Sequence, residues 1–457
     1  MGQPNQALAA LAEEARFSEA GLARRVNDLG RARGRTLTYD YTSAYRWIQK
    51  GQRPRDPVPE LIAEALAERL GRRITLADIG MATADAVPGD VGLDYSNKLD
   101  DATRATTTLW RADLEDLTVV TGTPVNNAAW ADATLSWLVR SGPDQLHERT
   151  QGRKVGRAEI AALRATVDAF ARLDNQFGGD HARRVLIQYL RSDAAALLDG
   201  RYDERIGREL FAAIAEATLL AAWMTYDSGR AHGLAQRYFL QALRFAQAAD
   251  DALLGGSVLD AMSHQATFLG RHREAANLAR AARTGTAGRA TATLTAHFHA
   301  MEARALAAGS DTVGAERALS EAVRVFERRR PGNDPDWITY FDDAELSAEF
   351  SHCFRDLDRP TDAVTYAQRS LDGAGASVRS DFFVTMVLAD GYLVAGEVEQ
   401  ACTVARDALD LGEQLKSGRS VEYVRRFRQR LAPVAEVAAV RELDEYGTEH
   451  PLWTAAG

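Results

Sequence analysis

Cysteine and lysine are both scarce in this chain of 457 residues, whose two cysteines are Cys353 and Cys402. Two thiols in so long a chain exclude a disulfide framework and favour a reducing compartment, in which both are small, buried, apolar residues. The longest apolar stretch, residues 212–224, is interrupted by Glu216 and is too short to cross a bilayer. Residues 1–15 lack the basic and apolar regions of a signal peptide. These absences predict a cytoplasmic protein that does not interact with a membrane.

The sequence motifs of common enzymes and metal sites are also absent. There is no HExxH pair, no paired cysteine ligands, no nucleophile elbow and no dinucleotide-binding fingerprint. Residues 173–183 contain a double glycine in a dense polar turn, but no strand precedes it and no Gly-Lys-Ser/Thr follows. A helix C-cap followed by a new N-cap is therefore favoured over a phosphate-binding loop. We expect no metal and no cofactor, and an enzyme is the least favoured class of function.

Charge is distributed unevenly along the chain. The net charge is −9, yet residues 16–55 hold ten Arg or Lys against three acids, so that this segment is +7 and the remainder is −16. A basic head on an acidic body predicts that only the head binds a polyanion. The hydrophobic content of 46% is enough for a folded chain, with room for roughly two or three domains.

Three amphipathic helices are predicted within the basic head. Ser18 is an N-cap for the first, and the second runs over residues 41–50 from a cap at Thr38 or Asp40 to Gly51. The third covers residues 61–70, and residues 74–79 close the unit. Trp47 and Ile48 are predicted core residues.

The segments Ser18-Glu-Ala-Gly-Leu-Ala23 and Tyr45-Arg-Trp-Ile-Gln-Lys-Gly-Gln-Arg-Pro54 resemble the helix-turn-helix domains of the XRE-type repressor family. The resemblance covers about the first 80 residues, and it departs from the family where residues 27–38 replace a short turn. It implies that the second helix lies in the major groove of double-stranded DNA, with Arg46 the best candidate to pair with guanine. The alternative for the arginines is a solvated face. The residues expected to face bases are Tyr41, Thr42, Tyr45 and Arg46, and those expected to reach phosphates are Arg35, Lys50 and Arg53.

A spacing of seven between small residues recurs five times in the acidic body. Seven residues are two helical turns, so both members of a pair face the same way and admit a neighbouring helix. The pairs follow one another at steps of 40, 40, 48 and 38 residues, which predicts an α-solenoid of helical hairpins. The pairs are Ala235/Ala242, Ala275/Ala282, Ala315/Ala322, Ala363/Ser370 and Ala401/Ala408, and the turns before them are at Gly229, Gly270, Gly309, Asp358 and Gly396.

These repeats resemble tetratricopeptide repeats, although their period exceeds that of the family, and a HEAT-like array is the competing architecture. The resemblance implies that the first helix of each hairpin lines a concave face. That face is expected to bind a peptide, a small molecule or a protein, and singly each residue is as consistent with packing or solvation. Counting back from each turn places there Trp223, Tyr226, Asp260, His264, His299, His352 and Arg355.

The predicted fold class is all-α, with a helix-turn-helix domain over residues 1–82, a linker over 83–101, a helical connecting region over 102–205 and the solenoid over 206–445. This order of parts, and the stretches His232–Phe239 and Ala261–Ala266, are similar to a group of actinobacterial (Streptomyces-type) regulators that join an XRE-type head to tetratricopeptide repeats. The resemblance implies a homodimeric transcriptional regulator that binds DNA. The alternative is a protein–protein interaction adaptor with a vestigial head.

Overall fold

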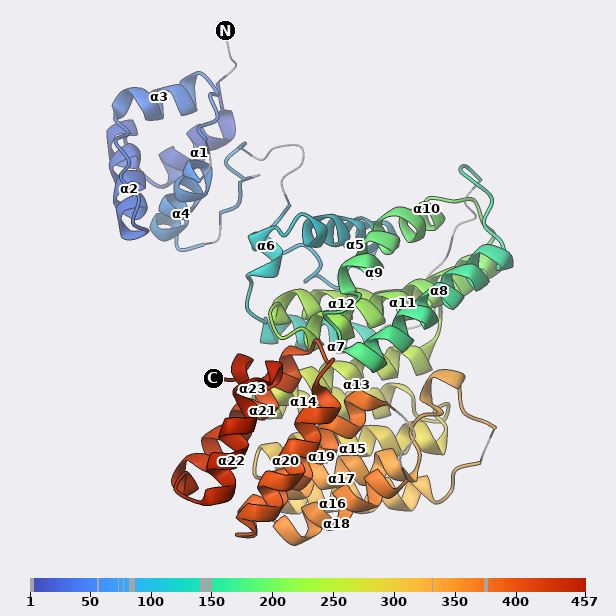
Figure 1. The fold of residues 1–457 in the computed structure, drawn as a ribbon. Coiled ribbons are helices and arrows are strands. Elements are labelled where there is room, and N and C mark those ends of the chain that lie inside the picture. The colour runs from blue at the N-terminus through green and yellow to red at the C-terminus, as the bar shows by residue number, and fades with distance from the viewer. Residues whose placement is uncertain are drawn as a thin grey trace. The chain divides into compact units, whose positions relative to one another are not determined.

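The computed structural model of the chain describes residues 4–55, 57–72, 74–76, 78–81, 87–139, 146, 150–330, 332–373 and 377–457. It is all-helical, and within these ranges the one strand-like contact is an isolated bridge between Lys154 and Arg201. The chain divides into two compact units, residues 1–88 and 89–457 (Figure 1). None of the described helices combines the length and the apolar character needed to cross a membrane.

The N-terminal unit consists of α1 (Gln6–Glu14), α2 (Glu19–Ala32), α3 (Tyr41–Gln49) and α4 (Val58–Leu70). Their apolar faces meet in one core, which includes Leu22, Val26, Trp47, Ile48 and Leu61. Helix α1 was not predicted from the sequence. Its N-cap Asn5 accepts a hydrogen bond from the Leu8 amide and donates one to the Ile79 carbonyl at 2.8 Å, so a tertiary contact fixes its start.

Local capping explains where α2 and α3 begin. The Gly21 amide donates to Ser18 Oγ at 3.1 Å, as predicted. Of the two predicted caps for α3, Asp40 is confirmed, since it accepts a hydrogen bond from the Ser43 amide at 2.9 Å. The hydrogen bonds from Ser43 hold the pKa of Asp40 below its usual value, so the cap is a carboxylate that suits a helix N-terminus.

The C-terminal unit contains an array of helical hairpins, as the small-residue spacing predicts. The predicted small pairs are buried and lie in the second helix of each hairpin. The turn residue has a left-handed backbone at four of the five predicted positions; in the third hairpin it is Ser310 (φ 62°) and not Gly309. The hairpins are α11 (Glu204–Asp227) with α12 (His232–Ala248), α13 (Ala252–Phe268) with α14 (His272–Gly285), α15 (Ala292–Ala308) with α16 (Thr312–Phe326), α17 (Asp343–Asp356) with α18 (Pro360–Asp372), and α19 (Val378–Val394) with α20 (Val398–Gly412).

Most of the predicted linker belongs to the C-terminal unit. Residues 82–86 lie outside the described part, but residues 89–97 are bound along α12. There Arg237 donates to the Val91 carbonyl at 2.6 Å, Gln241 donates to the Gly92 carbonyl at 3.0 Å, and Arg244 to the Ser96 carbonyl at 2.6 Å. The linker prediction is therefore wrong for this stretch, because side chains of the first hairpin satisfy its backbone carbonyls.

The predicted connecting region also packs on the hairpins. Helices α5 (Leu99–Leu114), α6 (Thr118–Thr121) and α7 (Asn127–Val139) contact α12, and α7 contacts α14 as well. Later in this region, residues 183–198 form α9 (Arg183–Tyr189), a π-helical segment over 190–194 and α10 (Ala195–Leu198).

Helix α8 (Arg157–Phe177) brings the two ends of the array together. It contacts α11 at the start of the array and α19 near the end. The Lys416 amide donates to the Phe177 carbonyl at 2.7 Å, and the Asp180 amide donates to the Lys416 carbonyl at 3.0 Å. The double glycine allows this approach, since a Cβ on Gly178 would lie 2.9 Å from the Lys416 carbonyl oxygen and a Cβ on Gly179 would lie 2.5 Å from the Met224 carbonyl oxygen of α11. The array of hairpins is therefore closed through α8 and the segment around Lys416. Three helices follow this junction, α21 (Gly418–Leu431), α22 (Ala438–Gly447) and α23 (Pro451–Ala455).

Candidate functional site

The α3 surface is defined here as Tyr41, Thr42, Tyr45, Arg46 and Lys50, of which Tyr45 is partly buried and the other four are exposed. Tyr41 is 54% exposed, and the rings of Tyr41 and Tyr45 stack with centroids 6.0 Å apart. The opposite side of α3 is buried through Ala44, Trp47 and Ile48, as the sequence predicts for the last two. The arrangement presents aromatic, hydroxyl and basic groups on a helix whose other face is fixed in the core.

The long connection between α2 and α3 is held in place by α2. The Asn27 side chain donates to the Tyr39 carbonyl at 2.8 Å and accepts from the Tyr39 amide at 2.9 Å. Leu37 packs so closely on Gly30 that a Cβ there would lie 2.4 Å from Leu37 Cδ1. The residues inserted between the two helices therefore form a defined connection that positions the start of α3.

The predicted phosphate-contacting residues differ in how firmly they are held. All three side chains, those of Arg35, Lys50 and Arg53, are exposed. Arg53 is held more firmly, because its Nε donates a hydrogen bond to the Met81 carbonyl at 3.0 Å.

A cavity of about 430 Å³ lies in the C-terminal unit and is called the inner cavity below. The first helices of the hairpins contribute most of its wall, and α8, α21 and the segment before α17 contribute the rest. Its aromatic side chains are Trp223, Trp337, Tyr340 and Phe383, and its ionisable groups are Asp174, Asp260, His264, His297, Arg304, Glu345, Glu349, His352, Arg379 and Arg419.

Ion pairs connect neighbouring helices around the inner cavity. Arg304 lies 2.6 Å from Glu349, which joins α15 to α17. Arg379 lies 2.6 Å from Asp174, a contact 205 residues apart in sequence that joins α19 to α8. Both pairs are largely buried, which makes each partner costly to remove.

A third pair joins His297 on α15 to Asp260 on α13, with Nδ1 2.8 Å from Oδ2. Burial disfavours the charged imidazole, but attraction to Asp260 outweighs burial and raises the pKa of His297. Burial also raises the pKa of Asp260, despite the nearby His297. The contact with Asp260 therefore favours the charged imidazole of His297.

Two further histidines in the wall are uncharged. Burial, reinforced by nearby arginines, lowers the pKa of His264 and of His352 well below the usual value. Nδ1 of His264 lies 3.0 Å from the Tyr226 hydroxyl, which is fully buried behind the wall. These imidazoles supply neutral hydrogen-bonding groups to the cavity.

A family model described as the SP15 N-terminal domain matches residues 8–82. The N-terminal unit is similar to that domain. No curated protein and no solved structure matches the chain.

Four of the seven residues predicted for the concave face line the inner cavity. They are Trp223, Asp260, His264 and His352, and Tyr226 lies directly behind His264.

The other two predicted residues lie elsewhere. His299 lies against Arg283 on α14, with its Nδ1 3.1 Å from the guanidinium, so its prediction for the concave face is wrong. His297 faces the cavity in its place, because residues two apart on a helix point in different directions. Arg355 lines a second cavity of about 670 Å³, which shares His264 and Arg304 with the first, and it is paired with Asp356 at 2.7 Å.

Sequence reasoning missed several residues of the inner cavity for two reasons. His297, Arg304, Glu345 and Glu349 lie on helices already expected to line it, at helical spacing from its lining residues, so a better estimate of helix rotation would have found them. Asp174, Arg379 and Arg419 reach the cavity through the closure of the array, for which the sequence carries no periodic signal. Within the described ranges, no three His, Cys, Asp or Glu side chains are grouped as a metal site would require.

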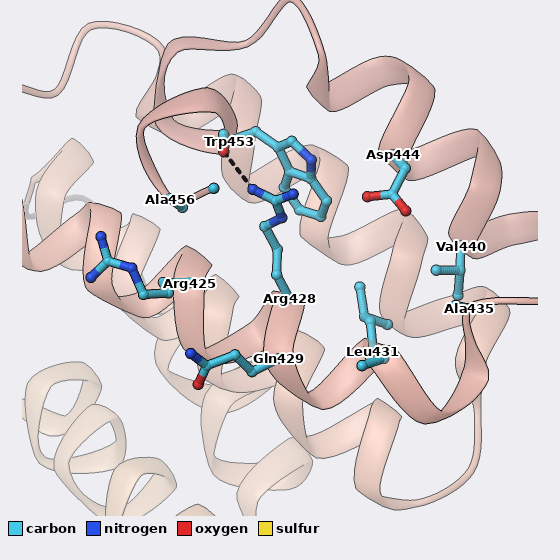
Figure 2. Close-up of a pocket in the computed structure, with 11 residues that line it drawn as sticks. Arg425, Arg428, Gln429, Leu431, Ala435, Val440, Asp444, Trp453 and Ala456 are labelled. Carbon is cyan, nitrogen blue, oxygen red and sulfur yellow. Dashed lines mark hydrogen bonds between the residues drawn. The ribbon is translucent and has the colours of Figure 1, made fainter.

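A further cavity, of about 420 Å³, lies between α21, α22 and α23 (Figure 2). Arg428 crosses it and lies over the Trp453 ring, 4.7 Å from its centroid, while donating to the Trp453 carbonyl at 2.9 Å (Figure 2). The guanidinium of Arg428 is thus already bound to other groups of the protein and is less available to a ligand. For this reason the inner cavity is the stronger candidate for a ligand-binding site.

Proposed function

We propose that this protein is a DNA-binding transcriptional regulator whose helical-repeat unit senses a ligand or partner. The observation that carries the proposal is the α3 surface, a set of aromatic, hydroxyl and basic side chains exposed on one side of a helix. A helix of this kind fits the major groove, where Arg46 would pair with guanine and Tyr41, Thr42 and Tyr45 would contact base edges. The inner cavity supports the second part, because it collects polar groups from many hairpins.

Phosphate contacts account for the orientation of the head on DNA. Lys50 and Arg53 lie at and just beyond the C-terminal end of α3, and Arg35 lies in the connection after α2. Cations at these positions would fix the head on DNA without reading sequence. The rest of the chain is acidic and would be repelled by DNA, so that binding would be confined to the head.

A ligand would regulate DNA binding if it bound one arrangement of the protein more tightly than another. We propose a homodimer, in which the two heads would read half-sites about one helical turn of DNA apart.

The direct test is selection of random double-stranded DNA by the full chain at physiological salt. One recovered motif, and a palindrome in particular, would support a sequence-specific dimeric regulator. Retention without a motif, or no retention, would contradict sequence-specific reading and favour the adaptor with a vestigial head.

Arg46→Ala separates base reading from phosphate binding. We expect it to cost about 1–3 kcal/mol of binding free energy and to relax the preference at one base position. The control is Arg328→Ala, which removes an exposed arginine of the C-terminal unit and should leave the recovered motif unchanged. An unaltered motif with Arg46→Ala would refute the role of Arg46.

A further inference from the structure

One carboxyl group of the inner cavity forms no ion pair with another described residue, although the positive charges of His297 and Arg379 act on it from a distance. Three of its four carboxyl groups are paired, Asp174 with Arg379, Asp260 with His297 and Glu349 with Arg304. The fourth, Glu345, lies in the first turn of α17 and accepts a hydrogen bond from Ser380 Oγ at 2.8 Å. Among the described residues it forms no ion pair.

The remaining cation of the wall is not available to Glu345. Arg419 lies 3.6 Å from Asp227, and its guanidinium is over the rings of Tyr226 and Phe383, at 5.0 and 4.5 Å from their centroids. With that pair included, the carboxyl groups around the cavity outnumber the cationic partners by one. The unbalanced group is Glu345.

Two buried carboxylate oxygens of the wall are also without a hydrogen-bond donor among the described residues. Asp174 and Asp260 are 3% and 5% exposed, and one carboxylate oxygen of each, Oδ1, accepts no hydrogen bond in the described structure. Buried polar atoms are nearly always hydrogen-bonded, so each unpaired atom requires an explanation. Four buried nitrogens of the wall also lack a hydrogen-bond partner in the part of the chain described, namely Nε of Arg304 and of Arg419 and Nδ1 of His297 and of His352. The two guanidiniums are already paired with carboxylates, and Nδ1 of His297 lies 2.8 Å from Oδ2 of Asp260.

Partial burial affects the protonation of Glu345. Burial raises the pKa of Glu345 to about 7, and the negative charge of Glu349 adds to this shift, while the hydrogen bond from Ser380 and the charge of His297 oppose it. The charged form of a partly buried carboxylate without an ion-pair partner is disfavoured, and a cation bound beside it would stabilise that form.

Aromatic and apolar side chains complete the wall. Trp223, Trp337 and Phe383 come from three different segments, and Leu220, Met301 and Val384 lie with them. The volume of about 430 Å³ falls within the range of roughly 300–1,000 Å³ that is typical of small-molecule sites.

We propose that the inner cavity binds an organic cation, a protonated amine or guanidine attached to a flat apolar body, with Glu345 as its counter-ion. The aromatic side chains would pack on the apolar body, and the ammonium would donate hydrogen bonds to Glu345 and to the unused oxygen of Asp260. That such a cation is the effector of a regulator depends on the proposed function. That the cavity binds such a cation does not depend on it.

The test is a calorimetric titration of the full chain with matched probes and without DNA. The amines are tryptamine and phenethylamine, tryptophol is the neutral counterpart of tryptamine, and indole-3-propionate is an anionic one. We expect both amines to bind, and tryptophol to bind about ten- to a hundredfold more weakly than tryptamine, which is the ratio for loss of a charge-assisted hydrogen bond.

Glu345→Gln is the decisive variant, because glutamine is similar in shape and still accepts the hydrogen bond from Ser380. It should weaken tryptamine binding about ten- to a hundredfold and leave tryptophol binding nearly unchanged. Glu399→Gln, an exposed position on α20, is the matched control and should alter neither. Circular dichroism of each variant checks that it is folded.

Several outcomes would overturn the inference. They are failure of both amines to bind at millimolar concentration, equal binding of tryptamine and tryptophol, tighter binding of indole-3-propionate, or unchanged tryptamine binding by a folded Glu345→Gln variant. Because the titration contains no DNA, its failure leaves the DNA selection result standing, and failure of that selection leaves the titration interpretable.

Discussion

Asp227 is the residue on which closure of the helical array depends most. It is fully buried at the end of α11. Its Oδ2 accepts a hydrogen bond from the Gly179 amide at 2.9 Å, and its Oδ1 accepts one from Ser417 Oγ at 3.0 Å. The guanidinium of buried Arg419 lies 3.6 Å from the same carboxylate. One side chain therefore joins the α8–α9 connection and the start of α21 to the first hairpin.

Asp227→Ala should destabilise the C-terminal unit by about 3–5 kcal/mol. Each hydrogen bond to a charged acceptor contributes about 1.5–3 kcal/mol, and breaking a buried ion pair costs about 3–5 kcal/mol. The hydrogen bonds and the ion pair share one carboxylate, so their contributions to the free energy of unfolding are not additive. The larger of the two, that of the ion pair, therefore sets the expected loss. That total is a large fraction of the roughly 5–15 kcal/mol by which folded proteins are stable.

Asp251→Ala is the matched control. Asp251 caps α13 by accepting a single hydrogen bond, from the Leu254 amide at 2.9 Å, and it is partly exposed. Loss of such a cap costs about 1 kcal/mol. The two variants make the same chemical change in the same unit and differ in whether the carboxylate connects the ends of the array.

Urea unfolding of the full chain, followed by circular dichroism, measures the difference in stability between the two variants. Hydrogen exchange reports closure directly, because the amides of Asp180 and Lys416 donate across the junction. Both amides should exchange faster in Asp227→Ala and be unchanged in Asp251→Ala. Equal destabilisation by the two variants, or full protection of the Lys416 amide in Asp227→Ala, would refute the reasoning.

Three further predictions concern other parts of the chain. The pKa of Glu345 in the folded protein, about 7, is above the usual value of 4.5, so the folded protein keeps a proton that the unfolded chain releases. The free energy of unfolding should therefore fall by about 1–3 kcal/mol as the pH rises from about 4.5 to 7. Urea unfolding at several pH values should show this fall in the wild type and not in Glu345→Gln. Asn27→Ala removes two hydrogen bonds to Tyr39 and should cost about 1–2 kcal/mol of the stability of the N-terminal unit; under the proposed function it should also weaken DNA binding in a gel-shift assay. Gly285→Ala places a Cβ 2.0 Å from the Trp137 ring and should lower stability by about 1–3 kcal/mol in thermal unfolding.

Each of these has an outcome that contradicts it. Identical pH dependence in wild type and Glu345→Gln would show that the carboxyl group titrates alike in the folded and unfolded states. Unchanged DNA affinity in Asn27→Ala would show that the connection does not position α3. Gly288→Ala is the control for Gly285, since a Cβ there meets no atom within 4 Å and the cost is confined to its positive φ of 78°; equal loss by both variants would refute packing of Trp137 as the cause.

The amino-acid sequence alone determines the helical hairpins and the exposed side of α3. Pairs such as Ala235/Ala242 are seven residues apart, and this spacing places both members on one side of a helix whatever surrounds it. The cap at Asp40 and the buried residues Trp47 and Ile48 are local in the same sense, because a few neighbouring residues fix the start and the inward face of α3.

Tertiary structure decided the rotation of each helix toward the cavity and the meeting of the two ends of the array. Periodicity identifies which residues share a face, but it leaves open the direction in which that face points, and this is why His299 was expected where His297 lies. The contact between Asp174 and Arg379 spans 205 residues and follows from the summed geometry of every hairpin between them. No local sequence pattern encodes this accumulated geometry. The closure of the array and the lack of an ion pair at Glu345 among the described residues are therefore seen only in the folded chain.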